Sequence, residues 1–134
     1  MIERSASCSC GQLQLVCRGE PSRVSMCHCL ECQRRTGAVL SNQAWFAHEQ
    51  VSTVEGRTSE YVRISDDGQA VRFRFCPVCG STVFWEAEAR PSLIAVAVGT
   101  FADPGFPAPK HSVREKRQHR WLTMLADLQI QHAE

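Results

Sequence analysis

The sequence lacks a long apolar run, a strong charge imbalance and internal repeats. A membrane-spanning helix needs about 20 predominantly apolar residues, so we expect none. Residues 1–5 carry no apolar signal segment, which predicts a cytoplasmic protein. The formal net charge of +1 argues against nucleic-acid binding through phosphate charge as the main task of the protein. Residues 1–134 are therefore expected to form a single domain, with a core over about 7–122 and a tail over 123–134.

Short alternating or apolar runs between turn residues predict a mainly β fold with few short helices. We expect strands over 13–17, 24–26, 38–48, 51–54, 60–64, 70–75, 82–86 and 93–98. Asp67-Gly68 lies between two of these runs and predicts an antiparallel hairpin. The most apolar run, 93–98, is expected to be central.

Other segments predict interruptions of the β pattern. Three prolines make 103–109 an irregular loop. Residues 31–36 are expected to form about one helical turn that ends at Gly37. The apolar spacing after Arg120 predicts a short helix in the tail.

Seven of the eight cysteines fall into three tight clusters. They are Cys8 and Cys10, then Cys27, Cys29 and Cys32, then Cys76 and Cys79. In a reducing compartment such clusters indicate metal sites rather than disulfides. Zinc prefers four thiolates in a structural site, whereas three protein ligands leave a position for a substrate.

The spacing alone allows two ways of assigning these sulfurs to metal sites. The CxC and CxxC turns can close a four-sulfur structural site, each followed by a glycine, and leave a three-sulfur site that accepts an external thiol. Alternatively, Cys29 and Cys32 pair with Cys76 and Cys79 in a ribbon-like site, although the intervening segment far exceeds the usual ~15–20 residues.

Several other residues have both a structural and a functional interpretation. Cys17 is expected to be a small buried apolar residue. His28 is expected to point away from the two cysteines beside it. Phe75, Phe84 and Trp85 are expected in the core rather than on a substrate platform.

Positively charged side chains near the three-cysteine cluster are candidates for substrate binding. Arg34 and Arg35 follow Cys32 and can hold a substrate carboxylate, and His111 can line a pocket. We expect the basic residues of 110–120 to be solvated on the surface. The alternative is that they form an anion-binding face, which could also contact nucleic acid.

The ordered motifs resemble the glutathione-dependent formaldehyde-activating (GFA) family, which also includes centromere protein V. The matching residues are Cys8-Ser-Cys-Gly, Gly19-Glu-Pro, Cys27-His-Cys-xx-Cys, Gly37, Gly56, Tyr61, Arg74-Phe-Cys-xx-Cys-Gly-Ser, Gly99-Thr-Phe-xx-Pro, His111 and Trp121-Leu. This resemblance extends over about residues 7–122.

The resemblance implies antiparallel sheets in a β-tent arrangement stapled by a structural zinc. It implies that Cys8, Cys10, Cys76 and Cys79 bind this zinc, and that Cys27, Cys29 and Cys32 bind a second, catalytic zinc. We expect the second ion to be held more loosely. The implied reaction joins glutathione and formaldehyde, as a carbon–sulfur lyase run in reverse. Relatives tend to have an aromatic residue after the histidine and Asp-Gly-Leu-Pro near the end, whereas this chain has Ser112 and 126–129 reads Ala-Asp-Leu-Gln.

We therefore expect a zinc-dependent lyase that acts on the adduct of a small glutathione-like thiol with a small carbonyl such as formaldehyde. The alternative is a non-catalytic binding module in which both zinc sites only hold loops. A fourth protein ligand at the three-cysteine site would favour that alternative. The sequence is also compatible with a homo-oligomer, and predicts no membrane partner.

Overall fold

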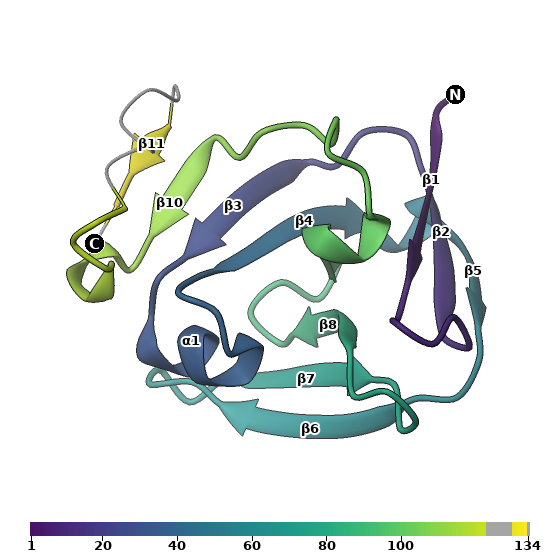
Figure 1. Cartoon of the computed structure of the whole chain (residues 1–134), viewed down its shortest axis with the longest axis horizontal. Coiled ribbons are helices and arrows are strands. Elements are labelled where there is room, and N and C mark those ends of the chain that lie inside the picture. Colours follow the sequence, from purple (N-terminus) through teal and green to yellow (C-terminus); the bar gives the residue numbers. More distant parts are fainter. Residues whose placement is uncertain (123–129, 134) are drawn as a thin grey trace.

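The computed structural model of the chain describes residues 1–122 and 130–133. The strands form two sheets, and the one described α-helix lies beside the larger of them (Figure 1). The mainly β prediction is confirmed. The expected helix of the tail falls mostly on 123–129, which lie outside the described residues.

The smaller sheet is antiparallel and has the strand order β1-β2-β5. Its strands are β1 (Glu3–Ser7), β2 (Gln14–Arg18) and β5 (Val51–Glu55). In β2, Leu15 and Cys17 are fully buried while Gln14 and Arg18 are exposed. This alternation directs one face of the sheet toward the core.

The larger sheet has the strand order β11-β10-β3-β4-β9-β8-β7-β6. Its strands are β3 (Arg23–Cys27), β4 (Ser41–Ala47), β6 (Ser59–Ile64), β7 (Ala70–Phe75), β8 (Thr82–Ala87), β9 (Leu93–Ala97), β10 (His111–Val113) and β11 (Gln131–His132). Its pairings are antiparallel except at one edge, where β10 runs parallel to both β3 and β11. As expected, β9 is central, between β4 and β8.

Short helices connect several strands. They are α1 (Leu30–Thr36) and the 3₁₀ helices η1 (His48–Gln50), η2 (Val98–Phe101) and η3 (Glu115–Arg117). The strand expected over 38–48 is shorter, because the chain enters β4 only at Ser41 and turns into η1 at His48. The hairpin of β6 and β7 forms as expected, with Gly68 at a φ of 80°.

Side chains on the two faces of the larger sheet have different surroundings. One face packs against the smaller sheet, where Phe46, Val83 and Val96 meet Leu13 and Leu15 in the main core. Trp45, Phe73, Trp85 and Ala95 form a second cluster. Neighbouring residues of one strand, such as Trp45 and Phe46, belong to different clusters because strand side chains alternate between faces.

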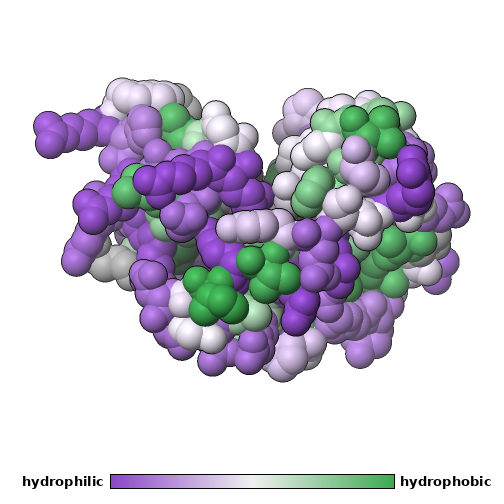
Figure 2. All heavy atoms as spheres, turned by 90° about the horizontal axis from the view of Figure 1, so that it is seen from below, coloured by the Kyte–Doolittle hydropathy of each residue, from purple (hydrophilic) through white to green (hydrophobic). Residues whose placement is uncertain are grey.

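Strand β6 forms the free edge of the larger sheet, and its exposed apolar residues include Tyr61, Val62 and Ile64. Seen from below in Figure 2, the molecule is largely hydrophilic, has small hydrophobic spots and is hollowed at its upper edge. Within the described part of the chain, no helix is long and apolar enough to cross a membrane.

Candidate functional site

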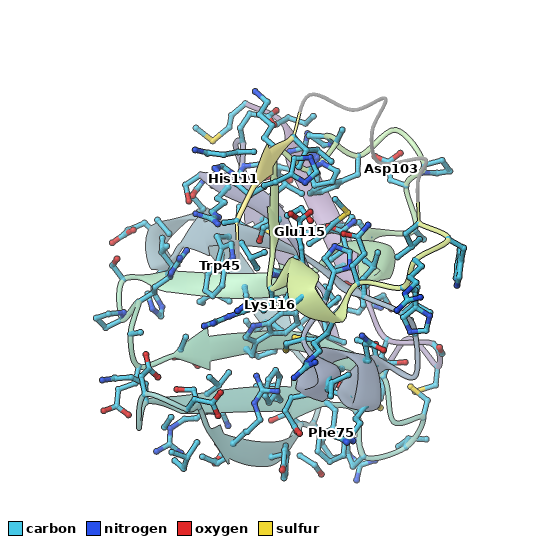
Figure 3. All side chains as sticks on the ribbon, turned by 90° about the vertical axis from the view of Figure 1, so that its left-hand side faces the viewer. Trp45, Phe75, Asp103, His111, Glu115 and Lys116 are labelled. Atoms are coloured by element: carbon cyan, nitrogen blue, oxygen red, sulfur yellow. The ribbon has the colours of Figure 1, made fainter. Side chains whose placement is uncertain are left out.

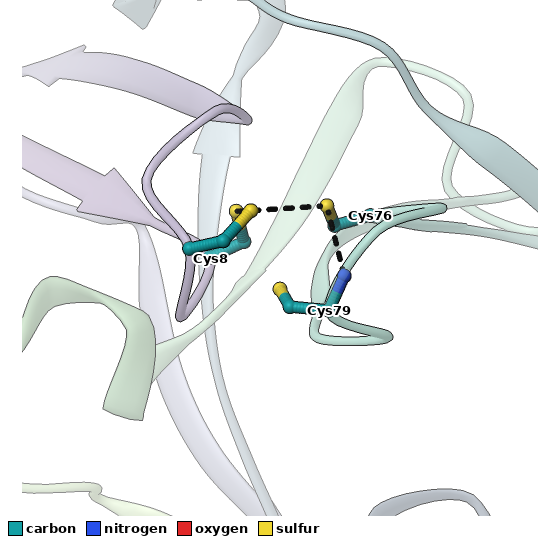
Figure 4. Close-up of side chains that lie close together, drawn as sticks. Cys8, Cys76 and Cys79 are labelled. Atoms are coloured by element: carbon teal, nitrogen blue, oxygen red, sulfur yellow. Dashed lines mark hydrogen bonds between the residues drawn. The ribbon is translucent and has the colours of Figure 1, made fainter.

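Four cysteines from two distant parts of the chain meet between the two sheets. Cys8 and Cys10 lie in the turn after β1, and Cys76 and Cys79 lie in the turn after β7 (Figure 4). Their four sulfurs lie within 4.8 Å of one another. The Cys10 Sγ is 3.6 Å from that of Cys8 and 3.7 Å from that of Cys76. The group therefore ties the smaller sheet to the larger one.

Donors around this group stabilise negative charge on sulfur. The backbone N–H groups of Leu13 and Val78 donate to Cys8 and Cys76, each over 3.3 Å. The side chain of Gln12 donates to Cys76 Sγ over 3.0 Å. A hydrogen bond with the Ser81 hydroxyl lowers the pKa of Cys79 from 9.0 to about 5. Thiolates are the form that binds metal, so these contacts favour metal binding.

The second group joins the end of β3 to the start of α1. Cys27 ends β3, Cys29 is the N-cap of α1, and Cys32 lies in its first turn. Their sulfurs lie within 4.8 Å of one another, and Cys29 Sγ accepts the backbone N–H of Cys32 over 3.3 Å. We call these residues the cysteine trio. Gly37 ends the helix in the left-handed conformation, with its N–H donating to Gln33 O.

The thiols of the trio share their protons unequally. Hydrogen bonds from Cys27 and Cys32 lower the pKa of Cys29 to about 2. Hydrogen bonds with its two neighbours, together with burial, raise the pKa of Cys27 far above its usual value. The pKa of Cys32 is also raised. The hydrogen bond with Cys27 lowers this pKa, but the hydrogen bond with Cys29 and burial outweigh that effect. The trio thus holds one thiolate readily before any metal binds.

His28 lies between two cysteines of the trio but its side chain turns away from them. The imidazole is fully buried, and its Nε2 lies 3.0 Å from the Ser112 hydroxyl of β10. Ser112 donates to Glu115, which also contacts His132 of β11. Glu115 and Lys116 begin η3, directly after β10 (Figure 3). Within the described residues, the group around the trio contains three potential ligands and not four.

A cavity of about 410 Å³ opens beside the trio. Cys27 and Cys32 lie in its wall, and Trp45, Phe73 and Trp85 provide an aromatic surface. Trp85 therefore belongs to a buried cluster, as expected, and also borders the cavity. A polar row of Ser25, Gln43 and Ser41 completes the β3–β4 side, joined by hydrogen bonds of 2.9 and 3.0 Å.

The same cavity is lined by five arginines and no acidic residue: Arg23, Arg35, Arg63, Arg90 and Arg114. Arg35 stacks over Phe73 and Trp85, at 4.7 and 4.5 Å from the ring centroids, and donates to Ser41. Burial lowers the pKa of Arg35, although the charge of Cys32 opposes that shift. The cavity is therefore suited to an anionic ligand.

The residues expected to bind substrate differ in their positions. Arg35 lines the cavity beside the trio. Arg34 is exposed and pairs with Glu31 over 2.8 Å. It lines a second, smaller cavity that adjoins the first and shares Arg35, Arg63 and Phe73 with it. His111 lies on β10, away from α1 in Figure 3, and lines neither. In the basic segment over 110–120, Arg114 reaches the cavity.

Sequence reasoning missed most of the cavity wall. Arg23 and Trp45 are opposite each other in the β3–β4 register, and Arg63 and Arg90 come from different parts of the chain. A signal was available for some of them, since Arg23, Ser25 and Cys27 alternate along β3, of which only residues 24–26 were predicted as a strand. Arg63 and Arg90 could be placed beside the cavity only if the order of the strands in the sheet were known, and the pattern of a single strand does not give that order.

Both cysteine groups have the donor set of a zinc site. Four thiolates about 2.3 Å from a tetrahedral zinc would lie roughly 3.8 Å apart. The sulfur–sulfur separations of 3.6 and 3.7 Å in the first group agree with this spacing. All seven donors are sulfurs, which favour zinc over magnesium or calcium. The residues present therefore fit zinc in both groups.

Comparison with known proteins agrees with these features. A crystal structure of a Rhodobacter sphaeroides protein is similar in fold, with a TM-score of 0.57 and 19% identity, covering 77% of this chain and 90% of that one. No curated protein matches the chain. The family model described as "Glutathione-dependent formaldehyde-activating enzyme" matches residues 3–119. Because this match covers most of the 134 residues, the chain belongs to the glutathione-dependent formaldehyde-activating family.

Proposed function

We propose that this protein is a zinc-dependent enzyme of the carbon–sulfur lyase type. It joins a small glutathione-like thiol to a small carbonyl such as formaldehyde, and splits the adduct in reverse. Family membership supports the use of glutathione and formaldehyde. The observation that carries the proposal is the juxtaposition of a three-sulfur group with a cavity rich in arginine.

The proposal gives the two cysteine groups different roles. Cys8, Cys10, Cys76 and Cys79 hold a structural zinc with four sulfurs. Cys27, Cys29 and Cys32 hold a catalytic zinc with three. When bound there, zinc supplies the Lewis acidity that lowers the pKa of a substrate thiol toward neutrality. The absence of a fourth ligand among the described residues supports this division over a purely structural second site.

The chain's own side chains bind and orient the substrate. Arg35 is held against Phe73 and Trp85 in the cavity wall. Cys32 lies in the same wall, and its charge acts on the Arg35 guanidinium. Arg35 is the residue that we assign to a substrate carboxylate near the reacting sulfur. Arg34 and His111 remain proposed contacts that would need a substrate extending beyond the cavity.

The reaction balances without an additional reactant. The sulfur lone pair of the thiol forms the new carbon–sulfur bond, and the carbonyl electron pair moves to oxygen. That oxygen takes up the proton released by the thiol, which gives a hydroxymethyl thioether. In reverse, the same carbon–sulfur bond breaks and the carbonyl is released.

The proposal is tested by measuring zinc content and glutathione-dependent consumption of formaldehyde. We expect Cys29→Ala to lose about one zinc per chain and the activity, because the trio loses its N-capping sulfur. Cys17→Ala removes a cysteine that belongs to neither group and should keep both. Equal activity in Cys29→Ala and the unaltered protein would refute the assignment.

A further inference from the structure

The arginines of the cavity are not neutralised by the protein itself. The ion pairs of the described residues involve other arginines, namely Arg4, Arg18, Arg34, Arg72 and Arg74. None of the five cavity arginines has a carboxylate partner within the described chain, and the cavity wall contains no acid. Two of these arginines, Arg90 and Arg114, are exposed, and the other three are half-buried, so water solvates part of their charge. A ligand that displaces this water must supply negative charge in its place.

These arginines are spread along the cavity. Arg35 and Arg63 act electrostatically on the trio, through Cys32 and Cys29. Arg23 lies four residues before Cys27 on β3, about 13 Å away along the strand. Arg90 stacks over Trp45, 5.1 Å from its ring centroid, and Trp45 faces Arg23 in the register. The positive charge therefore continues from the trio to the far end of the cavity.

Two of these side chains also have buried hydrogen-bond donors without a partner. The Nε atoms of Arg23 and Arg35 are inaccessible and unpaired. An unsatisfied buried donor on a charged group is costly. Because these two Nε atoms are inaccessible, a bound anion would not hydrogen-bond to them directly, but its negative charge beside the two guanidinium groups would offset part of this cost. Arg35 lies beside the trio and Arg23 at the far end of the cavity, so both ends favour an acidic group.

An ammonium group has no comparable partner in this cavity. The neutral acceptors there are Ser25, Ser41 and Gln43, and they already hydrogen-bond to one another. Glutathione carries two carboxylates but also one ammonium, which would lie among guanidinium groups. The charge of the cavity is matched better by a thiol that has the acids without the amine.

We propose that the preferred thiol of this site bears two or more acidic groups and no ammonium group. This inference rests on the proposed function, because it requires that a thiol binds at the trio. It narrows the class from glutathione-like thiols in general to polyanionic ones. Carboxylates and phosphates share the chemistry that the arginines recognise.

A matched pair of ligands tests this proposal. Glutaryl-cysteinyl-glycine is glutathione without its amino group, so the two differ only by the ammonium. With zinc-loaded protein and isothermal titration calorimetry at low salt, we expect glutaryl-cysteinyl-glycine to bind about tenfold more tightly, and the difference to shrink as salt screens the charges. Equal or tighter binding of glutathione would overturn the inference.

Variants locate the preference in the cavity. Arg90→Gln removes one charge at the far end and should reduce the ratio of the two dissociation constants severalfold. Arg18→Gln removes an exposed arginine of the smaller sheet and should leave that ratio unchanged. A ratio insensitive to Arg90→Gln would show that the arginines do not set the preference, and would overturn the inference.

A second pair of thiols tests whether the cavity recognises a phosphate as well as a carboxylate. Phosphopantetheine and pantetheine differ by one phosphate, and the phosphorylated thiol should bind more tightly if the cavity recognises anions in general. Tighter binding of the neutral thiol would contradict the inference. Failure of every thiol to bind zinc-loaded protein would instead refute the proposed function, and the inference with it.

Discussion

The side chain of Cys29 has two structural tasks at once. It caps the N-terminus of α1 and contributes the central sulfur of the trio. Cys17, by contrast, is fully buried between the sheets, and desolvation raises its pKa from 9.0 to about 12. We therefore expect variants of Cys29 to change the zinc content and variants of Cys17 to change the stability at alkaline pH.

Replacing Cys29 by Ser should lower the zinc content from two ions per chain to one, because an alcohol is a much poorer zinc ligand than a thiolate. Hydroxyl N-caps are favourable, so α1 should persist. The measurement is zinc by atomic emission together with circular dichroism. Two retained ions in Cys29→Ser would contradict the trio as a zinc site.

Cys17 should make the protein less stable at alkaline pH. Its thiol keeps its proton in the folded protein up to about pH 12, whereas the unfolded chain loses it near 9.0. The unfolded state then binds fewer protons, so the free energy of unfolding falls as pH rises from 9 to 12, by at most about 1.4 kcal/mol per unit. Urea unfolding of Cys17→Ala should show a shallower slope over that range; identical slopes would contradict the burial effect.

Arg35 should contribute mainly to substrate binding. Replacing it by Gln removes a charged donor to a substrate acid, which costs about 1.5–3 kcal/mol and corresponds to a rise in KM of roughly 10- to 150-fold. Arg34 is exposed and already paired with Glu31, so Arg34→Gln should change KM less. The reverse order of the two effects would show that the substrate lies outside the cavity.

At the scale of elements, turns hold the two cysteine groups in place. Gly37 ends α1 at a φ of 66°, and a Cβ there would meet no atom within 4 Å. Gly56 has a φ of 100°, and its Cβ would come 2.0 Å from Gln12 O. The side chain of Gln12 donates to Cys76 and Arg57. The turn after β5 therefore supports the four-cysteine group.

Alanine at the two glycines should have unequal effects. In Gly37→Ala, the left-handed backbone conformation alone should lower the free energy of unfolding, by about 1–2 kcal/mol. Gly56→Ala adds a steric clash, for a combined loss of about 2–5 kcal/mol. Urea unfolding of both zinc-loaded variants measures the difference, and a smaller loss in Gly56→Ala would contradict the close approach of Gln12.

Elements with strong local signals could be predicted from the sequence, and those that depend on tertiary contacts could not. The hairpin of β6 and β7 has alternating residues around Gly68, and α1 has its glycine C-cap. Strand β1 has a polar sequence that becomes a strand only by pairing with β2. Strand β10 has three residues, and its parallel pairing with β3 depends on a partner far away in the sequence.

In the candidate site, too, residues with a local sequence signal could be predicted and residues placed by tertiary contacts could not. The sulfurs of the site cluster locally in sequence, so their spacing predicts metal sites, whereas the division into a group of four and a group of three follows from the resemblance to the family. The cavity arginines come from β3, α1, β6 and the segments after β8 and β10, and only the curved sheet brings them together. Arg35 was among the predicted residues because it is a neighbour of Cys32 in the chain, whereas Arg23 and Arg90 lack such a local cue.

At the scale of the whole molecule, the four-cysteine group links the two sheets across the main core. A zinc ion bound there, as we propose, would bind the folded chain preferentially. Its removal should therefore destabilise both sheets together.

The central claim is that the chain holds two zinc ions, one of them with only three protein ligands. Anomalous diffraction at the zinc absorption edge from crystals of zinc-loaded protein tests it most directly. The account predicts two peaks, one surrounded by Cys8, Cys10, Cys76 and Cys79 and the other by Cys27, Cys29 and Cys32 alone, facing the cavity. A single peak, or a fourth protein ligand at the second one, would contradict it.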